Sequence, residues 1–369
     1  MSDLPDDPSR DSIPLLLARP SRLSAVNRRS TPGGQADRPR PSIRVPSART
    51  DKTGPIGHLR SLLGRVGTLV AVFLVLVAVF ADMLASDLPI ACKLHGHIWL
   101  FPNITQPAEL VALGGDAVKS ESDWRISAPV PHSPTDRSTV LAAPWREETH
   151  PFGTDREGRD VFARVVHGAR TYLVFALGAV LVSLLLGGSL GAAAGLFGGP
   201  TDAFVGRAIE TVSSFPPLVL VLGIQAAVPK ATVGTLFLAI ALTRWPEVAR
   251  LVRAEVMQVA TRDYVLAARA LGASPLRVLS RHVAPNIRGQ LIVLGAIGVP
   301  AVILIEASLD FLRVGSSGAV SWGETMSEFR DASHAWWLLA FPGAFLFAAI
   351  VALNLVGEAR RDSLDPRAR

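Results

Sequence analysis

The chain has 369 residues, of which 49% are hydrophobic, and a formal net charge of +6. The apolar residues gather in long runs that contain almost no charge, which is typical of membrane proteins and excludes an ordinary soluble domain. The positive charge does not indicate nucleic-acid binding, because the basic residues lie in one tail and in loops beside these runs. We therefore predict an all-α integral membrane protein that contacts membrane lipid and no nucleic acid.

Residues 1–58 form the first region and are rich in proline, serine, arginine and aspartate. This segment has too little apolar surface to offset the entropy lost on ordering, so we predict a disordered tail. The apolar run Val66–Ala81 follows and extends to about Ala85, which predicts a first transmembrane helix within residues 59–85. The tail before this run is far longer than a normal leader, which favours a signal anchor over a cleaved signal peptide.

Residues 86–170 contain many prolines and one small apolar patch, Ile98–Phe101, which favours a loop-rich external insertion of short strands and turns. The end of this insertion, residues 152–166, has the pattern of an amphipathic elbow. We expect the charges of the elbow to position the segment and to contact other subunits. The single cysteine, Cys92, cannot form an intramolecular disulfide.

Five further apolar runs meet or approach the roughly 20 residues that a helix needs to cross a bilayer. They bring the predicted number of transmembrane helices to about six, and residues 171–369 form the predicted core. The fourth of the six is interrupted by Arg244–Glu247, so we expect it to end near the membrane interface. The five runs are Thr171–Thr201, Thr211–Pro229, Ala231–Ala249, Gly289–Leu312 and Trp336–Gly357.

The distribution of Lys and Arg beside these helices predicts the orientation, because basic residues favour the cytoplasmic side. Residues 1–65 contain twelve Lys or Arg. The segment 250–288, which we call the cytoplasmic loop, has seven Arg against two acids. We predict a multi-pass protein of the cell inner membrane with its N-terminus, its C-terminus and this loop in the cytoplasm.

Several residues divide the cytoplasmic loop into two short helices. Thr261 can cap the first helix, and Gly272 supplies the conformation that a helix C-terminus favours. Ser274 and Pro275 are the N-cap and first residue of a second helix, which Pro285 ends. A helix-turn-helix can read nucleic acid, but such readers do not normally lie tethered between two membrane helices. We therefore interpret the loop as a docking element for a protein partner.

This docking element combines small residues, which permit close approach, with arginines, which can pair with acids of a partner. The small residues are Ala267, Ala268 and Gly272, and the arginines are Arg269, Arg277 and Arg281.

The cytoplasmic loop resembles the EAA loop of importer-type ATP-binding-cassette permeases, in which two alanines precede a glycine and a later proline. The matching residues are Ala267, Ala268, Gly272 and Pro285. Two positions depart from the pattern, because its glutamate is Leu266 and its Ile-x-Leu is His282–Ala284. The segments YVLAARALGAS and RHVAPN resemble instead a subclass, the dipeptide, oligopeptide and nickel permeases.

Three further segments, His150–Thr171, Ser321–Met326 and Asn354–Arg367, are similar to this subclass. The resemblance implies an importer-type permease fold that forms half of a translocation pathway with a second homologous permease subunit. It also implies two ATP-binding-cassette ATPase subunits and an external solute-binding protein. The chain has no G-x-x-x-x-G-K-[ST] phosphate loop. We expect a partner ATPase to use ATP and Mg²⁺, and we expect no catalytic residue and no cofactor in this chain.

The candidate pathway residues lie in the predicted helices. Pro216 and Pro217 remove backbone donors and should kink the third helix, either as a fixed bend or to shape the pathway. Glu306 is expected to face the external mouth, a neighbouring subunit or an ion-pair partner, since acids are costly in lipid. Asp310 and Arg313 are three residues apart and are expected to pair on one helix face.

Gly187, Gly191 and Gly195 share one helix face, where small residues permit close approach of another helix. That helix can belong to the same subunit or to another one, and the spacing does not decide between them.

Two other classes of function fit parts of the sequence. An ion-coupled stand-alone transporter would use Glu306 as a proton or cation site, and a membrane scaffold would use the cytoplasmic loop to recruit a soluble partner. Peptide is favoured over nickel as the solute, because the predicted helices contain no cluster of His, Cys or Met. His150 and His167 lack the spacing of metal ligands, so we expect no metal site.

Overall fold

The computed structural model describes residues 55–146, 149–229, 232–315 and 320–364. The predicted tail therefore lies mostly outside the described residues, and only its last part is placed. Residues 55–58 belong to the first helix, α1 (Pro55–Val79), so this helix begins before the predicted boundary.

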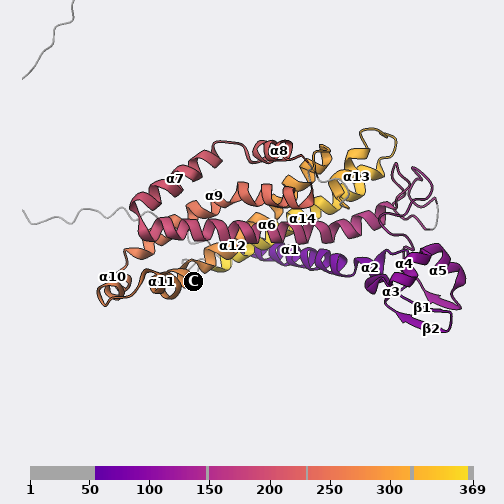
Figure 1. Cartoon of the computed structure of the whole chain (residues 1–369), viewed down its shortest axis with the longest axis horizontal. Helices are drawn as coiled ribbons and strands as arrows, with labels where there is room; N and C mark the ends of the chain where they lie inside the picture. Colours follow the sequence, from indigo (N-terminus) through magenta and orange to yellow (C-terminus); the bar gives the residue numbers. More distant parts are fainter. Residues whose placement is uncertain (1–54, 147–148, 230–231, 316–319, 365–369) are drawn as a thin grey trace, which may run out of the picture. The chain divides into compact units, whose positions relative to one another are not determined.

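Seven long helices carry the fold (Figure 1). The longest, α6, contacts α1, α9, α12 and α14, so it forms the centre of the bundle. Its N-terminus is fixed by Asp160, whose carboxylate accepts a hydrogen bond of 2.7 Å from the Ala163 N–H. The predicted boundary at residue 171 falls inside this helix, because nothing interrupts it there. After α1, the long helices are α6 (Val161–Phe197), α7 (Gly199–Ser213), α8 (Pro217–Ala227), α9 (Val233–Ala260), α12 (Ala284–Phe311) and α14 (Trp337–Leu364).

Four helical segments among the described residues are long and apolar enough to cross a membrane, by length and composition. They are Leu62–Val79, Val161–Phe197, Pro275–Phe311 and Trp337–Arg361. A fifth is counted if α7 and α8, which meet at an angle of 88°, form one broken span. The expected number was about six. The difference lies in α9, where charged residues from Arg244 onward interrupt an apolar stretch that is short for a span.

The contact between α6 and α9 answers the question left open by the three glycines. A Cβ atom at Gly187 would lie 2.4 Å from the Trp245 carbonyl oxygen, and one at Gly191 would lie 2.4 Å from that of Ala249. One at Gly195 would lie 2.8 Å from the Arg253 carbonyl oxygen, also on α9. The two helices run in the same direction and touch through their backbones, so these glycines pack within the chain.

The external insertion contains a small antiparallel sheet with strand order β2-β1-β3. The strands are β1 (Ala91–Leu94), β2 (His97–Leu100) and β3 (Trp124–Ile126), and three short helices accompany them, α3 (Pro102–Thr105), α4 (Ala108–Leu113) and α5 (Gly115–Glu121). Cys92 is fully buried in a cluster with Leu88, Leu110 and Val118. The predicted strands are present, and the helices were not predicted.

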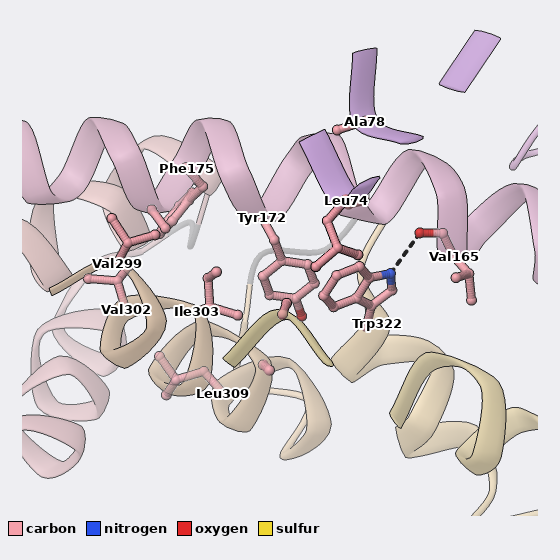
Figure 2. Packing of buried hydrophobic residues seen from close by; sticks show 14 of the residues in the cluster. Leu74, Ala78, Val165, Tyr172, Phe175, Val299, Val302, Ile303, Leu309 and Trp322 are labelled. Carbon is pink, nitrogen blue, oxygen red and sulfur yellow. Dashed lines mark hydrogen bonds between the residues drawn. The ribbon is translucent and has the colours of Figure 1, made fainter. Parts of the chain in front are cut away.

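A buried aromatic pair fixes α13 (Trp322–Glu328) against α6 (Figure 2). The Tyr172 and Trp322 rings stack with their centroids 4.7 Å apart. The Trp322 indole N–H donates a hydrogen bond of 2.8 Å to the Val165 carbonyl. Val302 and Ile303 of α12 pack into the same core. This core determines where the charged residues of α13 lie.

Candidate functional site: the cytoplasmic loop and the pathway residues

The predicted bounds of the cytoplasmic loop, 250–288, are too wide, because α9 extends to Ala260 and α12 begins at Ala284. Between them the loop folds as α10 (Asp263–Ala270) and α11 (Pro275–Val278), followed by one π-helical turn, η1 (Leu279–Val283). The prediction that Pro285 ends the second helix is wrong, because the chain continues from η1 into α12 and Pro285 lies in its first turn. Proline has no backbone N–H to donate, and the π-helical turn directly before Pro285 accommodates this missing donor. Thr261 does not cap α10 either, since its hydroxyl donates to the Gln258 carbonyl at 2.9 Å.

The predicted turn between α10 and α11 is confirmed in detail. Gly272 has a φ of 86°, which a residue with a Cβ adopts at a cost. Its N–H donates to the Arg269 carbonyl at 2.9 Å, and the Ala273 N–H donates to the Ala268 carbonyl at 3.0 Å. These two bonds make a Schellman motif. Ser274 then caps α11 by accepting from the Arg277 N–H at 3.4 Å.

Valines attach the loop to the long helices. Val265, Val278 and Val283 are fully buried and belong to one cluster with Val256 and Val259 of α9. Each buried valine side chain contributes roughly 1.5–3 kcal/mol relative to exposure. The loop is therefore packed against α9 and α12 and is not a free connection.

A polar contact joins the two halves of the loop and was missed by the reasoning from sequence. The Asn286 amide donates to the Tyr264 hydroxyl at 3.2 Å and to the His282 carbonyl at 2.5 Å. The Tyr264 and His282 rings lie 5.9 Å apart. All three residues stand in the two segments that carry the resemblance, YVLAARALGAS and RHVAPN.

Three leucines of the loop are exposed. Leu271 is 89% exposed, Leu276 is 73% exposed and Leu266 is half exposed. The leucines were not among the predicted docking residues. Of those that were, Ala267, Arg269, Gly272, Ser274, Pro275, Arg281 and Pro285 are exposed, and Ala268 and His282 are half-buried. We call these three exposed leucines the leucine face of the loop, and large apolar side chains exposed in this way are suited to a protein partner.

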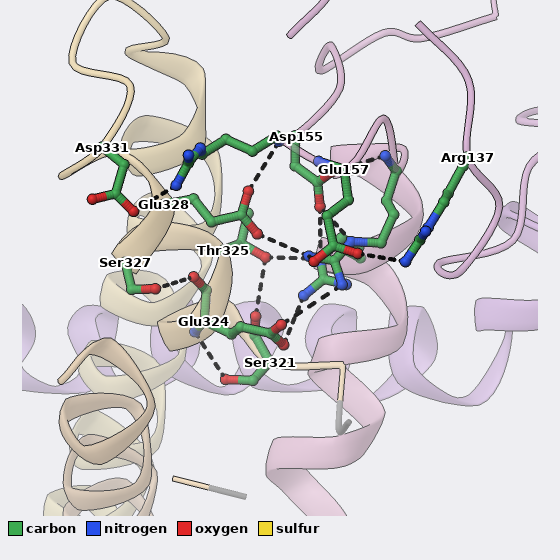
Figure 3. Close-up of polar contacts among 12 residues, drawn as sticks. Arg137, Asp155, Glu157, Ser321, Glu324, Thr325, Ser327, Glu328 and Asp331 are labelled. Carbon is green, nitrogen blue, oxygen red and sulfur yellow. Dashed lines mark hydrogen bonds and ion pairs between the residues drawn. The ribbon is translucent and has the colours of Figure 1, made fainter. Parts of the chain in front are cut away.

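The charges of the predicted elbow form ion pairs with α13 within the chain (Figure 3). The Arg159 guanidinium contacts the Asp155 carboxylate at 2.6 Å and that of Glu328 at 2.8 Å. Burial alone would lower the pKa of Arg159, but Asp155 and the neighbouring glutamates raise it. Burial raises the pKa of Glu328. The elbow charges therefore position α13, as expected for part of their role.

Arg164 completes this contact from the first turn of α6. It is buried, and its guanidinium donates to the Thr325 hydroxyl at 3.0 Å and to the Glu324 carboxylate at 2.9 Å. Two separated segments, one before α6 and one before α14, are thereby held together.

The acids of α12 do not behave alike. Glu306 is buried, and one of its carboxylate oxygens has no hydrogen-bond partner among the described residues. Asp310 accepts a hydrogen bond from the Ser321 hydroxyl. The predicted pairing of Asp310 with Arg313 is wrong, because the Arg313 guanidinium contacts Asp331 instead. The turn after α12 directs Arg313 toward the end of α13 and away from the helix face of Asp310.

Pro216 and Pro217 lie at the break between α7 and α8, where Pro216 directly precedes α8 and Pro217 begins it. The two helices meet at 88°, so the predicted kink is a complete break. Within the described residues, no cluster of three or more His, Cys, Asp or Glu has a geometry that could hold a metal ion.

Residues 170–369, more than half of the chain, match the family described as the binding-protein-dependent transport system inner membrane component. The chain belongs to this family. It is therefore a permease subunit of an inner-membrane transport system, and the exposed cytoplasmic loop lies within the matched region.

This permease aligns with similar proteins over most of the length of each of them. A putative peptide transport system permease protein of Brucella suis is 38% identical over 220 residues, which are 59% of this chain and 74% of that protein. The oligopeptide transport system permease protein OppC of Bacillus subtilis is 36% identical over 222 residues, 60% of this chain and 72% of that protein. The dipeptide transport system permease protein DppC of Bacillus subtilis is 35% identical over 242 residues, 65% and 75% of the two chains.

Proposed function

We propose that this permease subunit forms half of the pathway of an ATP-driven peptide importer. The observation that carries the proposal is the exposed leucine face of the cytoplasmic loop, Leu266, Leu271 and Leu276, on an element attached to α9 and α12. Peptide as the solute is supported by the similar proteins, whose names specify peptides, oligopeptides and dipeptides.

The cytoplasmic loop docks onto one of two ATP-binding-cassette ATPase subunits, which bind ATP and Mg²⁺ and hydrolyse ATP. Its partner across the pathway is a second homologous permease, and an external solute-binding protein delivers the peptide. The excess of arginine in this loop supports its cytoplasmic position, together with that of both termini. ATP-driven movement of the ATPases then tilts α9 and α12 through the valine cluster and changes access to the pathway.

The test is affinity purification of the tagged chain in mild detergent with its natural partners co-expressed. The wild type should bring down a second permease and ATPases. A Leu271→Asp/Leu276→Asp variant should lose the ATPases, because two buried leucines at an interface become charged. A matched control, Leu113→Asp, changes an exposed leucine of the external insertion and should retain them.

Uptake measurements separate the alternatives. Vesicles that contain the whole assembly should take up a labelled tripeptide only when ATP is present inside the cytoplasmic compartment. Uptake driven by an ion gradient without ATP would favour the stand-alone transporter, and binding of ATPases without any uptake would favour the scaffold. Uptake of nickel instead of peptide would change the solute and leave the assembly as proposed.

A further inference from the structure

A charged pair lies halfway along the apolar part of the bundle. The chain carries no charge between Arg170 of α6 and Asp202 of α7, and Gly187 of α6 lies near the middle of this stretch. The backbone of α9 touches α6 at this point, since a Cβ on Gly187 would lie 2.4 Å from the Trp245 carbonyl oxygen. The Arg244–Glu247 turn of α9 is therefore at the same level, and its two side chains form an ion pair of 2.7 Å.

The break between α7 and α8 occurs beside this turn. Arg250 of α9 donates to the Ser213 hydroxyl at the end of α7 at 3.0 Å. A cavity of about 160 Å³ lies between the break and α9, lined by Ser213, Pro217, Arg244, Glu247 and Arg250, among others. This volume can hold several water molecules, and its wall offers charged and hydroxyl groups to them.

The Arg244 side chain is only 16% exposed, so of the ion pair it is Glu247 that faces open space. Trp245 and Ala249 are buried toward α6, whereas Glu247 has a side chain that is 59% exposed. An ionised side chain at the centre of a bilayer is costly, so it faces water or protein rather than lipid. The ion pair with Arg244 offsets part of this cost and does not remove the exposed carboxylate.

We infer that Arg244 and Glu247, together with the α7–α8 break, line the water-filled solute pathway halfway across the membrane, and that Arg250 lines it about one helical turn closer to the cytoplasmic loop. The inference rests on the proposed function, in which the second permease supplies the opposite wall. The chemistry fits a zwitterionic peptide: the guanidinium groups pair with its carboxylate, and Glu247 pairs with its ammonium group. The break allows α8 to move relative to α7 as a peptide passes.

The test uses cysteine accessibility in the complete assembly in vesicles, because Cys92 is the sole native cysteine and is buried. A charged, membrane-impermeant methanethiosulfonate reagent should modify the Glu247→Cys variant at least tenfold faster than a Leu185→Cys variant. Leu185 is exposed on α6 two residues before Gly187 and serves as the control at the same level. Saturating tripeptide should slow the modification of the Glu247→Cys variant severalfold.

A second variant keeps the test valid if Glu247→Cys misfolds. Ser213→Cys replaces one atom at the wall of the same cavity and should show the same reactivity and the same protection by tripeptide. Rates for both variants as low as that of Leu185→Cys, in vesicles whose wild type imports tripeptide, would overturn the inference. An assembly whose wild type imports no peptide would instead overturn the proposed function, and this readout is independent of the labelling rates.

Discussion

The direct backbone contact between α6 and α9 predicts a sharp difference between two glycines of one helix. At Gly191, an added Cβ would lie 2.4 Å from the Ala249 carbonyl oxygen, which cannot rotate away. At Gly188, three residues earlier, an added Cβ would meet nothing within 4 Å. Gly191→Ala and Gly188→Ala are therefore the same chemical change in two different surroundings.

The magnitude follows from the contact. Ordinary van der Waals contact begins at 3.4 Å, so the backbones of α6 and α9 must separate by about 1 Å to admit the new methyl group. Overpacking of this kind costs about 1–3 kcal/mol, and a gap of this size along the helix pair weakens the neighbouring contacts as well. Both variants gain roughly 0.8–1.0 kcal/mol of helix propensity, which cancels in their difference. Gly191→Ala should be less stable than Gly188→Ala by about 1–3 kcal/mol.

The assay is the thermal unfolding of the purified chain in detergent, followed by a fluorescent thiol probe or by loss of monodispersity. Gly188→Ala should unfold at or above the temperature of the wild type, and Gly191→Ala several degrees below it. Equal unfolding temperatures for the two alanine variants would refute the argument, because they would mean that α6 and α9 are not held at backbone contact.

Two further predictions concern the cytoplasmic loop and the charged contact with α13. Gly272→Val should reduce the peptide-stimulated ATPase activity of the assembly at least fivefold, while Gly272→Asn should keep most of it. Of the two new residues only asparagine tolerates a φ of 86°, and an added Cβ at this position meets no other atom. Equal activities of the two variants would exclude a backbone effect. Burial raises the pKa of Glu328 above 4.5, so the folded state binds the proton of this carboxyl group more tightly than the unfolded state does. The tighter proton binding stabilises the fold at low pH, and this contribution is lost as the pH rises through the folded-state pKa. From pH 4.5 upward, the unfolding temperature of Glu328→Gln should therefore fall less than that of the wild type. Parallel curves of unfolding temperature against pH for the two proteins would contradict a raised pKa of Glu328.

Local patterns in the sequence were sufficient to identify several parts of this protein. Long runs without charge identified the membrane helices, since only apolar side chains are stable in lipid. The Gly272, Ser274 and Pro275 succession identified the turn of the cytoplasmic loop, because each residue type acts through its own backbone conformation or side-chain oxygen. The motif of the loop identified the family, as the match over residues 170–369 confirms.

Other features depended on residues that are distant in the chain. The partner of Arg313 is Asp331 and not Asp310, since the turn after α12 sets its direction. The three glycines of α6 gave no indication of which helix they contact, and only the parallel packing of α9 decided it. The same packing places the Arg244–Glu247 turn beside Gly187 of α6, within a helix that continues to Ala260, although in the sequence these residues appeared to mark a helix end. The sequence determined which side chains tolerate lipid, and the tertiary structure determined the level at which the exceptions lie.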